Sequence, residues 1–365
     1  MTTLLRMLVA ALALALLHTG QARAYRLYGP YPFGDEGMIY YNKWGDIHHA
    51  GATGGTITWS IMPDGTGIHP DFKQFHDPDD LVSGASSLVA IMNGLGYAEA
   101  LAGIQRAMDR WSAASNIYFQ YVEEVPGRSF NDPAAAPPHT GHIRFGAFDI
   151  DAPVGAFGYA PPPNGGTLEG DVILNSNSSF RFAPGDEGDL IDVFNDFESL
   201  IMHETGHAVG LDHSETQSVT SLDFEIYKFV NRELDPDDIA AVQFLYGPAL
   251  AADFDRDNDA DAADLTAWKL GFSRSNGAER ADGDADRDGD VDCADFLVWQ
   301  LEARATSAGV RLTAATAPEP SAYVLMSMVA AALAAARSRR SRRGRAPHPA
   351  PEPTRPSRRR AADCG

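Results

Sequence analysis

The chain has 365 residues, of which 44% are hydrophobic and 22% charged, so it can bury a sizeable core. Its 2 cysteines exclude a disulfide-stapled scaffold. Between the two chain ends, residues 25–336 hold 17 basic and 48 acidic side chains, a net charge of −31. Such an acidic body repels phosphates and suits bound cations, so we expect no nucleic-acid partner.

Residues 1–24 have the features of a secretory signal peptide. Arg6 precedes an apolar run that ends at Leu17, and Ala22-Arg23-Ala24 is a small-x-small cleavage site. A buried first helix is the weaker interpretation, because a run this short rarely spans a bilayer or packs as a first element. We expect export and a mature chain that starts at Tyr25. Residues 25–50 fit a leader, an extra strand or a partner of Asp237 and Asp238, and the sequence does not decide among these three roles.

Residues 51–248 read as an α+β domain. Alternating or short apolar runs at 56–61, 117–122, 142–145 and 171–174 predict strands. Apolar positions at helical spacing predict a helix over 98–113, and a second helix begins near Phe197. Two Pro-rich stretches, 126–141 and 159–170, are expected to be surface loops.

The strongest motif is HETGHAVGLDH, from His203 to His213. On a helix, His203 and His207 project from one face and can ligate one ion. Gly210 ends the helix and lets the chain turn so that His213 supplies a third nitrogen. Three neutral imidazoles leave one tetrahedral position open, which is typical of a catalytic zinc, and Glu204 is placed to act as general base on a water there.

This motif resembles that of the metzincin zinc endopeptidases, and specifically the matrixins. The segment from Leu234 to Gly247, LDPDDIAAVQFLYG, is similar to the last helix of that family, with aspartates at its start and glycine at its end. The resemblance implies a twisted mixed sheet with a long helix and an active-site helix, one catalytic Zn²⁺, and a protein or peptide substrate.

The sequence departs from the family pattern at three places. Matrixins place a methionine in a turn below the metal, and this chain has Ser221 or Leu222 there. Phe157 and Ile173 stand where histidines would hold a second, structural zinc, so one zinc is expected. No cysteine precedes the motif, so cysteine-based latency is not available.

Tyr227 fits either the wall of the substrate pocket or the core.

An acidic repeat follows at residues 249–305. Two runs, 31 residues apart, present carboxylates at positions 1, 3, 5, 9 and 12 of an EF-hand-like loop, with Asn258 and Gly289 at the tight turn. The expected ligands of two Ca²⁺ ions are Asp253, Asp255, Asp257, Asp261, Asp264, Asp284, Asp286, Asp288, Asp292 and Asp295. Each loop leads into a short helix, at 265–270 and 296–301. The pair resembles a type I dockerin, which implies a small α-helical module and a cohesin-like docking partner. An acidic solvated linker is the alternative.

The C-terminal part resembles a PEP-CTERM sorting signal. A linker at 306–320 ends in Pro318-Glu319-Pro320, an apolar stretch covers 321–336, and an Arg/Pro-rich tail covers 337–365. A short anchor with arginines on the cytoplasmic side would hold the chain in the membrane before processing. An ordinary anchor without processing is the alternative.

Together these features predict an exported zinc-dependent endopeptidase of the cell envelope or extracellular space, tethered through a calcium module. The alternative is a catalytically inert metzincin-like adhesion or assembly protein, which the absent methionine favours. Glu204 argues for the enzyme, because an inert domain has no need of a general base.

Overall fold

The computed structural model describes residues 25–34, 37–77, 79–163, 166–191, 195–214, 218–220 and 229–307, without the side chains of 305–307. The predicted signal peptide, the Pro-Glu-Pro linker, the apolar stretch and the Arg/Pro-rich tail lie outside the described residues. Ser221, Leu222 and Tyr227 lie outside them as well. Within the described ranges, every helix is too short or too polar to cross a bilayer.

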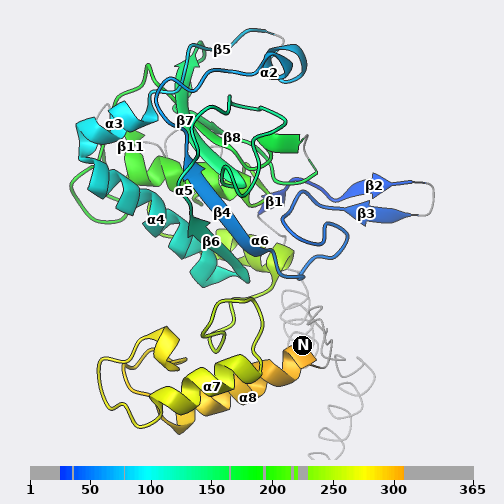
Figure 1. Cartoon of the computed structure of the whole chain (residues 1–365), viewed down its shortest axis with the longest axis vertical. Coiled ribbons are helices and arrows are strands. Elements are labelled where there is room, and N and C mark those ends of the chain that lie inside the picture. Colours follow the sequence, from blue (N-terminus) through cyan, green and yellow to red (C-terminus); the bar gives the residue numbers. More distant parts are fainter. Residues whose placement is uncertain are drawn as a thin grey trace, which may run out of the picture. The chain divides into compact units, whose positions relative to one another are not determined.

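A mixed sheet organises the larger part of the fold, with strand order β6-β4-β7-β9-β8 (Figure 1). The strands are β4 (Gly55–Ile61), β6 (Ile117–Tyr121), β7 (Ile143–Ile150), β8 (Ala156–Gly158) and β9 (Val172–Asn175). The first four in that spatial order are parallel, while β8 runs antiparallel to β9, and β5 (Val82–Ser83) pairs antiparallel with β7. All four predicted strands are present, and β7 extends five residues beyond its predicted end.

Helices cover the sheet and complete its core. They are α2 (Pro70–Phe75), α3 (Leu88–Leu95), α4 (Tyr97–Ala114), α5 (Phe197–Ala208) and α6 (Pro236–Tyr246), with a short 3-10 turn η1 (Gly166–Leu168). Helix α4 buries Ile104, Met108 and Trp111, which recur at helical spacing, against a core that includes Trp59 and Phe197. Removing these large apolar side chains from water is the main stabilising contribution. The mixed sheet and its helices confirm the predicted α+β class.

Residues 25–50 belong to the fold through short strands and a buried tryptophan. In this segment, β1 (Arg26–Leu27) pairs with β12 (Leu211–Asp212), and β2 (Tyr31–Phe33) pairs with β3 (Met38–Tyr40). A third two-stranded sheet, outside this segment, pairs β10 (Phe180–Arg181) with β11 (Asn195–Asp196). Trp44 is buried, and its Nε1 donates to the carbonyl of Ala208 at 2.9 Å. The segment thus holds the three short strands β1, β2 and β3.

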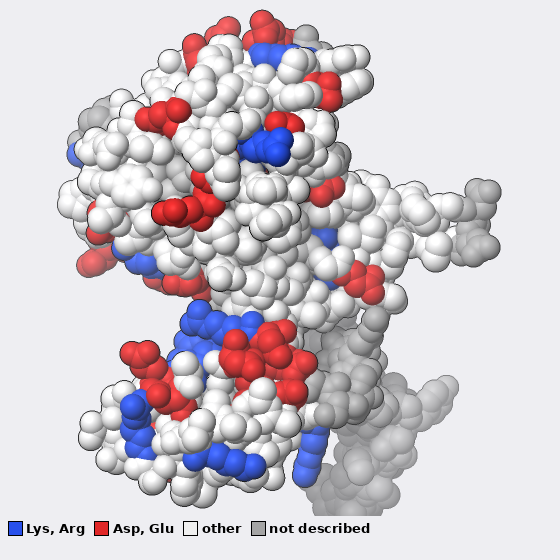
Figure 2. Space-filling model, viewed as in Figure 1, with Lys and Arg blue, Asp and Glu red and all other residues white. Residues whose placement is uncertain are grey.

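The acidic repeat forms two loops and the helices α7 (Ala262–Gly271) and α8 (Cys293–Ser307), with a 3-10 turn η3 (Arg280–Asp282) between them. Helix α7 starts three residues before the predicted position, because Asp261 caps it and Asp264 closes a capping box. The rings of Trp268 and Phe296 join the two helices at a centroid distance of 4.8 Å. Acidic side chains gather on the visible face of this module in Figure 2.

Candidate zinc centre

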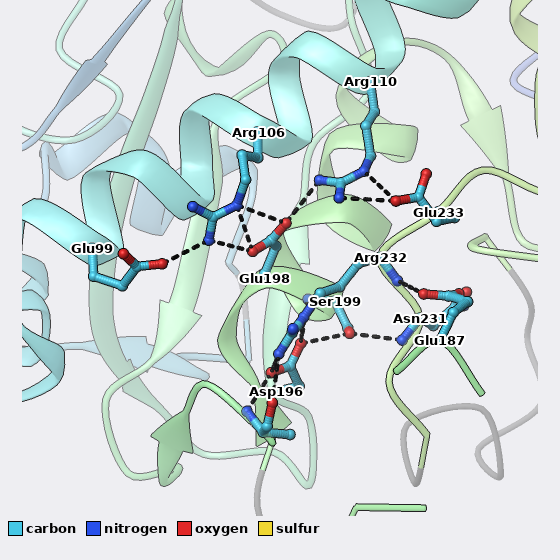
Figure 3. Close-up of polar contacts among 11 residues, drawn as sticks. Glu99, Arg106, Arg110, Glu187, Asp196, Glu198, Ser199, Asn231, Arg232 and Glu233 are labelled. Carbon is cyan, nitrogen blue, oxygen red and sulfur yellow. Dashed lines mark hydrogen bonds and ion pairs between the residues drawn. The ribbon is translucent and has the colours of Figure 1, made fainter. Parts of the chain in front are cut away.

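Helix α5 carries the first two histidines, and charged contacts fix where it begins. Asp196 caps the helix by accepting a hydrogen bond from the backbone N–H of Ser199. Glu198, in the first turn, accepts bonds from Arg106 and Arg110 of α4, while Arg232 donates to Asp196 (Figure 3). A buried helix start needs such partners, because its first backbone N–H groups have no partner within the helix and its carboxylates can no longer form hydrogen bonds with water.

Three histidine side chains converge at one point. His203 and His207 lie one turn apart on α5, and Gly210 then turns the chain with φ 103°. A Cβ at that position would lie 2.4 Å from the carbonyl oxygen of Asn42, so only glycine fits. The turn returns His213, and its Nε2 lies 3.2 Å from Nε2 of His207, which is also 3.2 Å from Nε2 of His203.

These nitrogens fit a zinc ion. Ligation at about 2.0–2.1 Å in a tetrahedron puts neighbouring nitrogens about 3.3 Å apart. The Nδ1 atoms of His203 and His207 lie 2.7 Å and 2.8 Å from the carbonyls of Val219 and Leu211. An Nδ1–H that donates to a carbonyl leaves the Nε2 lone pair free for a metal. Burial lowers the pKa of His203 and brings that of His207 to about 4, which keeps both rings neutral as ligation requires.

Glu204 faces the same site from the buried side of α5. Its side chain is 4% exposed, and burial raises the pKa of the carboxyl to about 8, against the lowering effect of a hydrogen bond from the backbone N–H of Gly158. Gly158 fits there because it has no side chain, since a Cβ would lie 2.6 Å from the carbonyl oxygen of Glu204. This contact sets the carboxylate against strand β8, at the rim of the sheet.

A cavity of about 380 Å³ opens over these groups. Its apolar walls come from the loop before β8 and from α5, and a concave site with few convergent polar groups is the usual form of a binding pocket. The lining includes Tyr28, Val154, Phe157, Leu200, His203, Glu204, His207 and His213.

Two contacts at the site come from residues that sequence reasoning did not assign. Asp238, in the predicted aspartate pair of α6, accepts the N–H of Val219 at 2.8 Å, and the carbonyl of Val219 faces His203. Tyr28 lines the cavity, with its hydroxyl 3.3 Å from Nδ1 of His207. The aspartate pair was a signal for the first contact. No sequence pattern marks Tyr28, because its contact depends on tertiary pairing.

The two positions considered for a structural zinc are cross-strand neighbours. Phe157 of β8 pairs directly with Ile173 of β9. Ile173 is fully buried, and Phe157 packs against the same apolar cluster, which includes Met62 and Phe72.

The acidic repeat brings most of its predicted ligands together. Carboxylate oxygens lie within 4.8 Å of one another in four groups, which are Asp253, Asp255 and Asp264; Asp259, Asp261 and Asp264; Asp284, Asp286 and Asp295; and Asp290, Asp292 and Asp295. Asp257 and Asp288 are outside these groups and accept backbone N–H bonds from Asp259 and Asp290. Asn258 and Gly289 have φ of 79° and 88°, which confirms their predicted left-handed geometry.

The region around the histidines is similar to known proteins. Residues 87–247 match the family model described as Matrixin. Karilysin of Tannerella forsythia is 34% identical over 100 residues, which are 27% of this chain and 19% of karilysin. Human matrix metalloproteinase-16 is 29% identical over 159 residues, 42% of this chain and 25% of that protein.

A plant relative gives the same result. Metalloendoproteinase 1-MMP of Arabidopsis thaliana is 27% identical over 144 residues, which are 40% of this chain and 37% of the relative. The chain thus spans between about a fifth and somewhat over a third of the length of these relatives. Residues 87–247 are therefore similar to a matrixin domain, and these similarities support a zinc metalloendopeptidase.

Proposed function

We propose that the protein is a secreted zinc-dependent endopeptidase in which His203, His207 and His213 hold the metal and Glu204 is the general base. The observation that carries this proposal is the convergence of three Nε2 atoms, 3.2 Å apart, in the cavity that Glu204 also lines. A structural role for the histidines would not account for the general base beside them or for an open cavity above them.

Glu204 does the proton transfers in the proposed reaction. Zinc, when bound, acts as a Lewis acid that polarises the scissile carbonyl and lowers the pKa of an attacking water. A cation held by the neighbouring histidines would lower the raised pKa of Glu204 again, so that its carboxylate accepts the proton of that water as it attacks and then delivers the proton to the nitrogen of the leaving amine. The bond from Gly158 N–H orients the carboxylate during both steps. The substrate is a peptide segment that lies in the cavity beside β8.

We also propose two accessory functions. The acidic repeat binds two Ca²⁺ ions and docks to a cohesin-like partner, supported by the carboxylate groups within 4.8 Å and by the left-handed turns at Asn258 and Gly289. Residues 1–24 direct export, and the segment from the Pro-Glu-Pro motif to the Arg/Pro-rich tail anchors or sorts the protein at the cell envelope. The sequence patterns of these two segments support their proposed roles in export and anchoring.

A peptide-library digest tests the peptidase against the inert alternative. The alternative has one observation in its favour, because no methionine occurs between Met202 and Met326. We expect the full chain with zinc and calcium to cleave, and a zinc chelator to abolish cleavage. Glu204→Ala and Glu204→Gln should lower kcat by about 10²–10⁴-fold, the usual contribution of a general base.

Glu123→Gln provides the matched control, because it makes the same change at an exposed carboxylate of the same domain. It should cleave like the wild type. A folded, zinc-loaded wild type that cuts no peptide in the library would instead support an adhesion or assembly protein.

A further inference from the structure

Strand β1 pairs with the short segment that lies between the second and third histidines. Leu27 is opposite Leu211 and Arg26 is opposite Asp212 in an antiparallel register. The backbone N–H of Tyr28 extends the pairing by donating to the carbonyl of Gly210 at 3.0 Å. The segment that returns His213 towards α5 is thus held along its length by the N-terminal strand.

Side chains add to this backbone pairing. The guanidinium of Arg26 lies 3.7 Å from the carboxylate of Asp212, the residue before His213. The ring of Tyr25 packs against Phe244 of α6 at a centroid distance of 6.3 Å, which fixes the start of the strand. Because the ion pair is partly exposed, it contributes little by itself, and the backbone bonds carry most of the constraint.

Tyr28 reaches the histidine cluster itself. Its hydroxyl lies 3.3 Å from Nδ1 of His207, and the two ring centroids are 6.0 Å apart. Nε2 of His207 faces the other two histidines, so Nδ1 carries the ring proton and shares it between the carbonyl of Leu211, at 2.8 Å, and the hydroxyl of Tyr28.

We propose that strand β1 is part of the zinc centre, with Tyr28 as a positioning residue that fixes the ring of His207. The inference rests on the proposed function, because it assigns a role within the same site. Tyr28 contacts the ring nitrogen that faces away from the other two histidines, so it orients a metal ligand and also forms part of the cavity wall. Partners of this kind determine how a ligand is aimed and how tightly the metal binds.

Metal affinity and metal spectroscopy test this role without relying on turnover. The full chain and its Tyr28→Phe and Tyr28→Ala variants would be titrated with zinc against a competing chelator. The Co²⁺-loaded proteins would be compared by visible absorption, which reports ligand geometry, and melting temperatures of the metal-free proteins would check the fold. Tyr31→Phe is the matched control, because it removes a hydroxyl from the neighbouring strand β2.

We expect Tyr28→Phe to weaken zinc binding towards the lower end of the ~10–100-fold range seen for outer partners of metal ligands, and Tyr28→Ala to weaken it further. Both variants should change the Co²⁺ spectrum while the metal-free melting temperature of Tyr28→Phe and all properties of Tyr31→Phe stay as in the wild type. Unchanged zinc affinity and an unchanged spectrum in both Tyr28 variants would overturn the proposal.

A second result would also overturn it. If zinc affinity is unchanged and kcat/KM rises in Tyr28→Ala, the strand obstructs the cleft and does not support the centre. Failure of the proposed function can be distinguished from failure of this inference. If the wild-type protein binds zinc but cleaves no peptide, the endopeptidase proposal fails, while the zinc affinities of the Tyr28 variants still test the role of Tyr28.

Discussion

Asp171 is a buried carboxylate whose charge is poorly compensated. It lies at the start of β9 with no exposed surface, and its Oδ1 accepts the backbone N–H of Arg144 at 2.8 Å. Its Oδ2 is buried with no hydrogen-bond partner in the described part of the chain. The guanidinium of Arg144 is itself paired with Glu124, so it offsets only part of the cost. Burial therefore raises the pKa of Asp171 well above its usual range, despite the lowering effect of Arg144.

Replacing this carboxyl should stabilise the protein in a pH-dependent way. The pKa of Asp171 is higher in the folded than in the unfolded protein, so protonation of this carboxyl stabilises the fold. The stabilisation is complete below the unfolded pKa of about 3.9, and it is lost as pH rises through the folded pKa. A neutral amide at the same position does not titrate and has no such loss. We expect Asp171→Asn to raise the free energy of unfolding at pH 7 by on the order of 1–3 kcal/mol, a gain that shrinks as pH falls towards 4.

Urea denaturation at several pH values would measure this effect. Asp151→Asn is the control, because it makes the same substitution at an exposed site just after strand β7. A gain that is equal at pH 4 and pH 7 would contradict the titration argument, and a loss at every pH would mean that the carboxylate has a stabilising partner.

The sequence predicts the positions of those site residues that depend only on their neighbours along the chain. The spacing of His203 and His207 already places them on one helix face, and Gly210 marks the turn to the third histidine. The Tyr28 contact could not be predicted, because it depends on a strand that pairs across more than 180 residues. The sequence marked Asp238, Phe157 and Ile173 but not the contacts that they make, because the bond from Val219 to Asp238 and the pairing of Phe157 with Ile173 join separate elements.

A charged network attaches helix α5 to helix α4. The carboxylate of Glu198 is 2% exposed and lies 2.6 Å from Nη2 of Arg106 and 2.7 Å from Nη1 of Arg110 (Figure 3). Each arginine also contacts an outer carboxylate, Glu99 or Glu233. Because Glu198 is five residues before His203, the network sets the position of the helix that presents the first two histidines.

Loss of the inner carboxylate should be far more costly than loss of an outer one. Glu198→Gln leaves two guanidinium groups facing a neutral amide, and we expect it to lower the free energy of unfolding by about 2–4 kcal/mol, somewhat less than for fully buried pairs. Glu99→Gln removes an exposed partner of the same arginine and should cost less than about 1 kcal/mol. Equal losses for the two variants, measured by urea denaturation, would show that burial of Glu198 adds nothing.

Elements with a clear hydrophobic period were predictable, and very short ones were not. Helix α4 and strand β4 differ from their predicted bounds by about one residue, because the pattern of buried side chains continues to each end. Strands β1, β2 and β3 have two or three residues, too few to show a period, and their pairing is tertiary. The helices of the acidic repeat start earlier than predicted because their caps are aspartates of the loops.

Residues of the first acidic loop contact the mixed sheet near strands β4 and β6, both directly and through Arg280. Arg280 donates from Nε to the carbonyl of Asp253 at 2.9 Å and from Nη2 to the hydroxyl of Tyr118, on β6, at 2.7 Å. The side chain of Asn258, in the same loop, accepts a hydrogen bond from Thr53, which precedes β4. A change in the order of this loop should therefore reach strands β4 and β6.

Calcium should stabilise the sheet through the first loop. The clustered carboxylates repel one another until a divalent ion neutralises them, so binding and loop folding are coupled. An ion present at 100 times its Kd adds about 2.7 kcal/mol to the folded state. We expect calcium to increase the helical circular dichroism of α7 and α8 and to slow hydrogen exchange of the β4 and β6 amides.

Equivalent substitutions in the two loops separate these effects. Asp255→Asn and Asp286→Asn change the third position of the first and second loop, and both side chains are exposed. Each should reduce the calcium stoichiometry by one ion, but only Asp255→Asn should remove the calcium-dependent protection of β4 and β6. If the two variants have equal effects on those strands, the module stabilises the sheet as a unit. If calcium changes neither the circular dichroism nor the exchange, the repeat is an acidic surface and not a calcium module.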